Sequence, residues 1–193
     1  MANEIEMKFK VASHAAVKRR LASAGAKYVG GMIQTDCYYD TPHRDLLQRD
    51  SGLRVRTAAR LRGHTLHGDG RAMLTYKGPV DPTRRAKVRR EVETRIEDAA
   101  AMGEVLAALG FTPALTIQKK RITYRLGRCL VELDELPLIG CFVEIEGPSE
   151  SAIDAVREKL RIEDASTKSG YTKLIADACA DTGRKCREVV FRS

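Results

Sequence analysis

The stretch Glu4-Ile5-Glu6-Met7-Lys8-Phe9-Lys10-Val11 alternates strictly between charged and apolar residues. Successive side chains of a β-strand point to opposite faces, so this period of two predicts a strand with one charged and one apolar face. Further strands are predicted where alternating, β-branched or aromatic residues lie between turn signals. These segments comprise residues 32–39, 53–57, 72–77, 87–95, 115–126, 129–135 and 141–146.

Helical periodicity separates several of these strands. Ser13 is typical of a helix N-cap and precedes apolar residues at helical spacing, and similar patterns begin at Asp98 and after Pro148. Eight strands, mostly sequential and antiparallel, with helices between them indicate an α+β fold, and eight strands are enough to close a β-barrel. No long linker interrupts the chain. We therefore expect one domain over residues 1–182, followed by a basic, frayed tail over residues 183–193.

Charged residues are grouped on one face of almost every predicted strand. A sheet with helices on its apolar face and water on its charged face would explain any single pair. Like charges two residues apart lie about 6.5–7 Å from each other, however, and a solvated face gains nothing from repeating such pairs. If the sheet closes, the charges line a polar lumen and the helices cover the outside. The repeated pattern favours this second arrangement.

The grouped charges are of two chemical kinds. Paired carboxylates supply the oxygen ligands that Mg²⁺ or Mn²⁺ requires, whereas grouped Arg and Lys suit phosphate. The acids are Glu4, Glu6, Glu91, Glu93, Glu132, Asp134, Glu144 and Glu146. The bases are Lys8, Arg54, Arg56, Lys77, Arg89, Lys119 and Arg121. Together they predict a site for a metal-chelated polyphosphate.

Composition restricts the partners of the chain. Its 193 residues include 34 Lys+Arg and 26 Asp+Glu, a formal net charge of +8 that points to an anionic partner. Aromatic residues make up 5% and Trp is absent, which disfavours nucleic-acid recognition by base stacking. No apolar run approaches the roughly 18 residues of a membrane span, and no signal peptide is recognisable. The five cysteines form no CxxC pair, so we expect free thiols and a cytoplasmic location.

An ordered set of motifs makes the chain similar to the CYTH superfamily, also called triphosphate tunnel metalloenzymes. Glu4-Ile5-Glu6-Met7-Lys8 matches the ExExK signature of that family, which by itself is a short match. The remaining motifs follow in the family's order and extend the resemblance over roughly residues 4–175. They are Tyr39-Asp40-Thr41-Pro42, Gly52-Leu53-Arg54-Val55-Arg56, Leu74-Thr75-Tyr76-Lys77-Gly78-Pro79, Val88-Arg89-Arg90-Glu91-Val92-Glu93, Lys119-Lys120-Arg121, Leu133-Asp134 and Val143-Glu144-Ile145-Glu146.

The resemblance implies a tunnel that binds a triphosphate and one or two divalent cations, Mg²⁺ or Mn²⁺. Matched by position, the metal ligands would be Glu4, Glu6, Asp134, Glu144 and Glu146. The seven basic residues named above would form the phosphate cradle, with Glu91, Glu93 and Glu132 in support. The catalytic group would comprise Glu4, Glu6, Lys8, Asp134 and Glu144. Lys120 and Arg90 are left out, because both fall on the opposite strand face.

Three functions are compatible with such a site. The first is a metal-dependent triphosphatase that hydrolyses an inorganic or organic triphosphate, such as ATP or thiamine triphosphate. The second is a class IV-type adenylate cyclase that converts ATP to cyclic AMP and pyrophosphate. The third, suggested by the positive charge, is a polyphosphate- or nucleic-acid-binding module without catalysis, although paired carboxylates would repel nucleic acid. We favour a small triphosphate as partner and expect no membrane partner. The oligomeric state stays open, a homodimer included.

Overall fold

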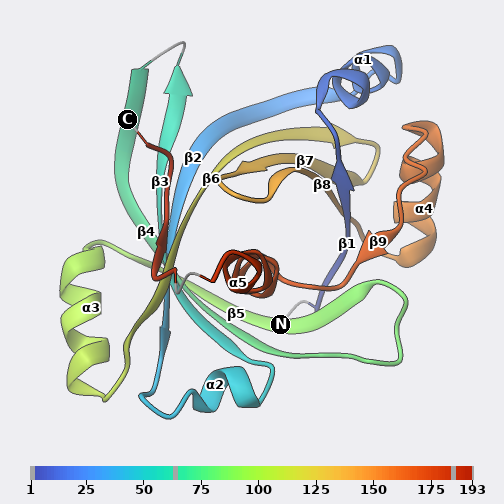
Figure 1. Cartoon of the computed structure of the whole chain (residues 1–193). Coiled ribbons are helices and arrows are strands. Elements are labelled where there is room, and N and C mark those ends of the chain that lie inside the picture. The colour runs from blue at the N-terminus through green and yellow to red at the C-terminus, as the bar shows by residue number, and fades with distance from the viewer. Residues whose placement is uncertain (1–2, 63–64, 184–185, 193) are drawn as a thin grey trace.

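The computed structural model describes residues 3–62, 65–183 and 186–192, and five helices accompany one continuous sheet in this part of the chain (Figure 1). The main strands are β1 (Asn3–Val11), β2 (Lys27–Asp40), β3 (Gly52–Arg62), β4 (Thr65–Val80), β5 (Lys87–Ile96), β6 (Thr112–Leu126), β7 (Cys129–Leu136) and β8 (Gly140–Glu146). The short strands are β9 (Ser166–Thr167) and β10 (Glu188–Val189). The helices are α1 (Ala15–Ser23), α2 (Asp45–Gln48), α3 (Ala99–Ala108), α4 (Glu150–Lys159) and α5 (Tyr171–Asp181).

The eight main strands form a closed antiparallel barrel. Their order is β6-β2-β3-β4-β5-β1-β8-β7, and pairing of β6 with β7 closes the ring. The register places Glu6 of β1 opposite Glu146 of β8, and Arg121 of β6 opposite Asp134 of β7. Because side chains alternate along each strand, these charged residues all point into the barrel. The structure thus confirms the predicted α+β fold with an eight-stranded barrel and a polar lumen.

The apolar faces of the strands point outward and are covered by helices. Phe9, Val131 and Ile145 are fully buried beneath α1 and α4, which contribute Leu21 and Ile153 to the same cluster. A smaller cluster forms where α3 packs over β2 and β3. Burial of these side chains stabilises the barrel from its outside, since its inside is occupied by charges.

A local sequence signal decides where α3 starts, but the expected signal does not set the start of α1. The Asp98 carboxylate accepts hydrogen bonds from the backbone N–H groups of Ala100 and Ala101, so it caps α3 as expected. At α1 the N-cap residue is His14, one residue later than the predicted Ser13. The imidazole of His14 is instead hydrogen-bonded with the carbonyl oxygen of Phe142, at 3.0 Å.

Helix α5 lies across one opening of the barrel (Figure 1). Its buried residues Tyr171, Ile175 and Cys179 pack against Ile117 and Phe142. These two residues lie in β6 and β8 at positions that alternate in phase with the lumen charges, so they are inward-facing. One end of the lumen is therefore apolar and is filled by α5.

The C-terminal segment differs from the sequence-based expectation. Strand β10 pairs in parallel with β6, and Val189 is buried in the same cluster as α5. A disulfide joins Cys179 to Cys186, whereas Cys37, Cys129 and Cys141 are free thiols. The predicted fraying is thus wrong at β10, because Val189 gains a buried apolar position. The expectation of free thiols is wrong for Cys179 and Cys186.

Membrane insertion by a helix finds no support in the fold. Within the described residues, no helix combines the length and the apolar character needed to cross a bilayer.

Candidate active site

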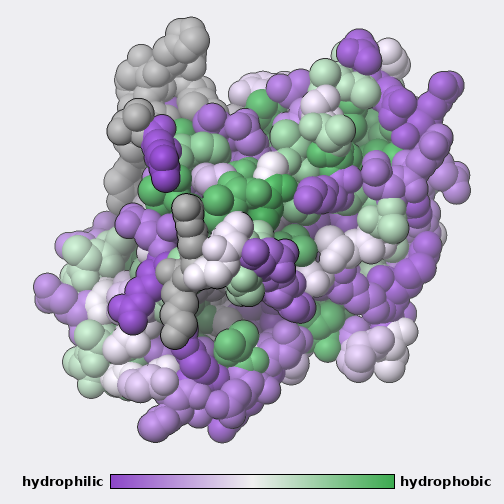
Figure 2. Space-filling model, viewed as in Figure 1, coloured by the Kyte–Doolittle hydropathy of each residue, from purple (hydrophilic) through white to green (hydrophobic). Residues whose placement is uncertain are grey.

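A cavity of about 1200 Å³ opens into the barrel between α5, α2 and the strands β3 to β5. Figure 2 looks onto this side of the molecule, where hydrophilic residues dominate the periphery and hydrophobic residues gather toward the centre. Sites for drug-sized ligands are about 300–1,000 Å³ and mostly apolar. This cavity is as large as such sites but is lined by charges, which suits an extended, highly charged ligand.

The structure brings nearly all the predicted site residues together around this cavity. Those that line it are Glu4, Glu6, Lys8, Arg54, Arg56, Lys77, Arg89, Glu91, Glu93, Lys119, Arg121, Glu144 and Glu146. Glu132 and Asp134 face the lumen but are absent from the cavity lining, because Arg121 lies between them and the open space. The alternation of side chains along the strands of the closed barrel therefore brings the predicted charged residues into one lumen.

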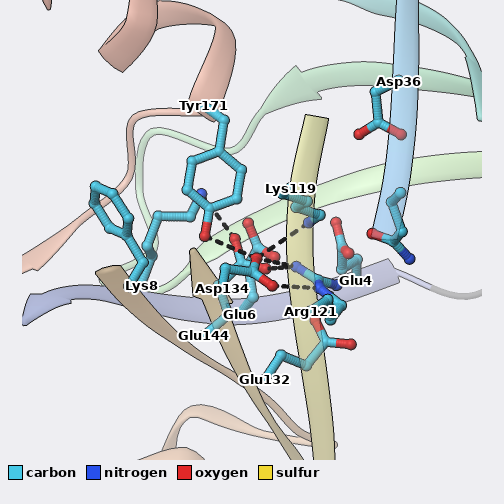
Figure 3. A network of polar contacts seen from close by, with 12 residues as sticks. Glu4, Glu6, Lys8, Asp36, Lys119, Arg121, Glu132, Asp134, Glu144 and Tyr171 are labelled. Atoms are coloured by element: carbon cyan, nitrogen blue, oxygen red, sulfur yellow. Dashed lines mark hydrogen bonds and ion pairs between the residues drawn. The ribbon is translucent and has the colours of Figure 1, made fainter. Parts of the chain in front are cut away.

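Arg121 is the centre of a buried ion-pair network (Figure 3). Its Nε donates a 2.7 Å hydrogen bond to Asp134 Oδ1, and its two terminal nitrogens contact Glu132, Asp134 and Glu144. Burial raises the pKa of Glu132 to about 7, and the neighbouring acids Asp134 and Glu144 add to that effect. The network thus holds three acids around one guanidinium at the cavity wall.

Asp134 is fully buried, and other side chains engage both of its oxygens (Figure 3). Lys119 Nζ lies 3.1 Å from Oδ2, and the Tyr171 hydroxyl donates to the same oxygen at 2.9 Å. Burial by itself raises the pKa of Asp134, but Arg121 and Lys119 outweigh it and hold the pKa below its ordinary value. The arrangement favours a role for Asp134 in orienting these cations.

Lys8 and Glu144 form a second buried pair on neighbouring strands. Their charged atoms are 2.9 Å apart, and Lys8 also donates to the Ser169 carbonyl oxygen at 3.3 Å. Although burial opposes the charged form, Lys8 and Arg121 hold the pKa of Glu144 well below its usual range. Glu144 is thus ionised at neutral pH and holds the Lys8 ammonium at the cavity wall.

A further group of charges lies on β2, β3 and β4. Asp36 accepts hydrogen bonds of 2.5 and 2.7 Å from Nε and Nη2 of Arg56 and one of 3.5 Å from Arg54. Burial favours the neutral acid, yet Arg56 and Arg54 depress the pKa of Asp36 far below its ordinary value. Arg54 also donates to Thr75, and its buried Nε has no hydrogen-bond partner among the described residues.

The opposite wall, formed by β1, β4 and β5, carries a mixed acidic and basic cluster. Lys87 Nζ is 2.6 Å from Glu6, while Lys77 contacts Glu91 and lies 3.6 Å from Glu4. Burial and a hydrogen bond with Glu91 raise the pKa of Glu4. The charges of Lys77 and Lys87 act in the opposite direction but do not outweigh these effects.

The acids Glu4, Glu6 and Glu146 have the chemistry of a divalent-cation site. Glu6 and Glu146 lie directly opposite each other, and like charges in that position destabilise a sheet unless a counter-ion is present. Burial and the charges of Glu4 and Glu6 raise the pKa of Glu146. A buried oxygen of Glu4 has no hydrogen-bond partner among the residues that the structure describes. Carboxylate oxygens are the ligands preferred by Mg²⁺ and Mn²⁺. The donor set therefore fits such an ion. In the part of the chain that the structure describes, no three acids, His or Cys already converge as ligands.

Asp36 and Lys87 are two of the charged cavity residues that are missing from the sequence-based set. Lys87 shares its strand face with Arg89, Glu91 and Glu93, so alternation could have identified it. Asp36 has no charged neighbour two residues away, and the like-charge pattern could not reveal it. Arg89 lies at the rim, where it donates to the carbonyl oxygens of Gly78 and Asp50.

The chain belongs to the CYTH domain family, whose sequence profile matches residues 2–174. This match, together with the charged barrel cavity, defines the class of the protein and agrees with the resemblance seen in the motifs.

The names of individual relatives refer to two activities, adenylate cyclase and triphosphatase. A Methanocaldococcus jannaschii protein named "Putative adenylate cyclase MJ0240" is 30% identical over 160 residues, 82% of each chain. Adenylate cyclase CyaB of Aeromonas hydrophila is 27% identical over 172 residues, 88% of this chain and 81% of the relative. HpAC1 from Hippeastrum, described as having a dominant triphosphatase activity, shares the fold with a TM-score of 0.67 at 19% identity, over 94% and 97% of the two chains.

Proposed function

We propose that the protein is a divalent-metal-dependent triphosphatase that hydrolyses an inorganic or organic triphosphate in the barrel cavity. One observation carries this proposal: one cavity is lined both by Lys and Arg and by the carboxylates Glu4, Glu6 and Glu146, and burial with neighbouring acids raises the pKa of Glu4 and Glu146. A triphosphate needs the first and its chelated metal needs the second. A simple polyanion-binding surface would gain nothing from the carboxylates.

Binding of the triphosphate would fall to the basic residues. Arg54 and the lysines Lys8, Lys77, Lys87 and Lys119 line the same cavity from different strands. Several cations spread over one cavity can each meet a different phosphate of an extended chain, so they fix its position along the barrel. Their carboxylate partners keep them in place before the ligand arrives.

Catalysis of phosphoryl transfer depends on positioning and on neutralisation of charge more than on covalent chemistry by side chains. Glu4, Glu6 and Glu146, with Glu144 beside them, would hold the metal. When bound there, a divalent ion would supply charge neutralisation on phosphate oxygens and lower the pKa of water. Lys8, Arg121 and Lys119 would neutralise the charge that develops on the transferred and leaving phosphates, because they line the same cavity as these acids.

The names of two relatives favour an adenylate cyclase as the second candidate. In that reaction the ribose 3′-hydroxyl of ATP attacks the α-phosphorus and pyrophosphate leaves. The same cations and acids would serve, with a different phosphorus beside the acidic cluster. We rank hydrolysis first, because nothing in the charged wall distinguishes the α-phosphate from the others.

A product assay separates these activities. Purified protein with Mg²⁺ or Mn²⁺ is incubated with tripolyphosphate, thiamine triphosphate or ATP, and phosphate, pyrophosphate and cyclic AMP are quantified together. We expect phosphate release without cyclic AMP, and loss of turnover on chelation of the metal with EDTA. Cyclic AMP with pyrophosphate would replace the hydrolase by the cyclase. Absence of all products over a range of pH would leave a binding module, whose affinity would fall steeply with salt.

The pH dependence of hydrolysis should report on Lys119. Burial, and secondly the charge of Arg121, lower the pKa of Lys119 to about 8. Below that pH its ammonium is charged and attracts phosphate, and above it the free protein loses one cation. We expect kcat/KM for tripolyphosphate to fall above about pH 8, by roughly tenfold per pH unit.

The control for this prediction is Lys119→Arg, since a guanidinium stays protonated throughout the range. The variant should lose the inflection near pH 8 while retaining measurable turnover. An unchanged inflection in the variant would assign it to another group.

A further inference from the structure

Tyr171 is the first residue of α5, and it contacts more charged residues of the barrel than the start of a helix requires (Figure 3). It is nearly buried, and its ring, its hydroxyl and the preceding backbone each contact a charged residue of the barrel. We propose that Tyr171 is a positioning residue of this site, through which α5 sets the placement of Lys8, Lys119 and Asp134. This inference rests on the proposed function.

The ring of Tyr171 lies against two ammonium groups that face the cavity. Lys8 Nζ is 4.0 Å from the ring centroid, and Lys119 Nζ is 5.1 Å from it. The negative face of an aromatic ring attracts cations, so one ring contacts both ammonium groups. The ring therefore helps to hold in place two of the cations that a triphosphate would meet in the cavity.

The hydroxyl of Tyr171 acts on a different group. It donates to Asp134 Oδ2 at 2.9 Å, the oxygen that Lys119 also contacts, while Arg121 Nε binds Oδ1. Burial and the charges of Glu144 and Asp134 raise the pKa of Tyr171 well above its ordinary value, so the hydroxyl keeps its proton and remains a donor. Its hydrogen bond orients the carboxylate that in turn orients Arg121 and Lys119.

The contacts come from a helix far away in the sequence, and Tyr171 is the residue of α5 that makes them. The ring of Phe142 packs edge-to-face on Tyr171 at 5.3 Å, and Ile175 and Cys179 anchor the next two turns. The Ser169 carbonyl oxygen, just before the helix, accepts from Lys8 at 3.3 Å. A loss of α5 contacts would free Lys8 on two sides at once.

Two substitutions separate the ring from the hydroxyl. Tyr171→Phe removes only the hydrogen bond to Asp134, and we expect kcat for tripolyphosphate to fall about fivefold with KM within twofold of wild type. Tyr171→Leu also removes the ring, and we expect KM to rise at least tenfold, because two phosphate-binding cations lose their common contact. The main effect of Tyr171→Leu should thus be on KM, and the main effect of Tyr171→Phe should be on kcat.

Ile175→Ala provides the matched control. Ile175 is buried on the same face of α5 in an apolar cluster, so this variant removes apolar packing of the helix and leaves the ring and the hydroxyl of Tyr171 in place. Its melting temperature should fall at least as far as that of Tyr171→Leu, with KM within twofold of wild type. A tenfold rise of KM in Ile175→Ala, or an unchanged KM in Tyr171→Leu, would overturn the positioning role.

Calorimetric titration with tripolyphosphate distinguishes this inference from the proposed function. If the wild type binds tripolyphosphate but turns over no triphosphate, the triphosphatase proposal fails. The positioning role then stands only if Tyr171→Leu weakens binding at least tenfold and Ile175→Ala does not. Equal affinities for tripolyphosphate in wild type, Tyr171→Phe, Tyr171→Leu and Ile175→Ala would overturn the positioning role, whether or not hydrolysis occurs.

Discussion

Glu6→Gln is expected to lower kcat for metal-dependent triphosphate hydrolysis by at least about 100-fold. The substitution keeps the shape of the side chain and removes one of the negative charges that face Glu146 across β1 and β8. A divalent cation would then meet a weaker donor set, so the metal concentration for half-maximal activity should also rise. Initial rates measured over a range of Mg²⁺ and Mn²⁺ concentrations report both changes.

Glu135→Gln is the matched control for that experiment. Glu135 lies on β7 with its side chain outside the barrel, where it is half-exposed and paired with Lys120 at 3.7 Å. The same chemical change at this position should leave kcat and the metal requirement unaltered. Should Glu6→Gln retain more than a tenth of the wild-type kcat, Glu6 could not be a principal metal ligand.

Strand alternation explains how much of the site was predictable from the chain. Glu4, Glu6 and Lys8 point inward because the strand period is two, and the same argument places Lys120 outside, where the structure has it. Closure of the sheet turns a pattern on separate strands into a common lumen. Most of the charged strand residues that form the cavity wall can therefore be predicted from the sequence.

Features that depend on packing over long sequence distances were not predictable in this way. Asp36 contacts Arg54 and Arg56 only because β2 pairs with β3 in one particular register. Tyr171 reaches Lys8 because α5 fills the apolar end of the barrel. The local sequence around Tyr171 favours a helix start over contact with a substrate, and it does not place Tyr171 beside Lys8. The segment after Gly183 was predicted to be frayed because it is rich in positive charge, so the burial of Val189 was not predicted.

The ion pairs of the cavity serve positioning more than stability. Taking charges out of water costs free energy, which their mutual attraction offsets only when the geometry is good, so buried pairs give little net stabilisation. The barrel instead gains its stability from the outward clusters under α1, α3 and α4. Removing one partner has a different consequence, since the other charge then stays buried without compensation.

Asp134→Asn should therefore lower the free energy of unfolding by about 3–5 kcal/mol. Asp134 is fully buried and contacts Arg121, Lys119 and Tyr171, so the amide leaves two cations beside a neutral group. Urea denaturation at neutral pH measures the change, with Glu135→Gln as an outward control that should stay within about 0.5 kcal/mol of wild type.

The same variant should alter the acid limb of the stability curve. The folded-state pKa of Asp134 lies below its ordinary value, so its contribution is present above that value and is lost as the pH falls through the folded pKa. The difference in unfolding free energy between wild type and Asp134→Asn should consequently shrink on acidification below about pH 4. A difference that persists undiminished at low pH would mean that Asp134 stabilises the barrel by its shape, and that Arg121 and Lys119 find their counter-charges elsewhere.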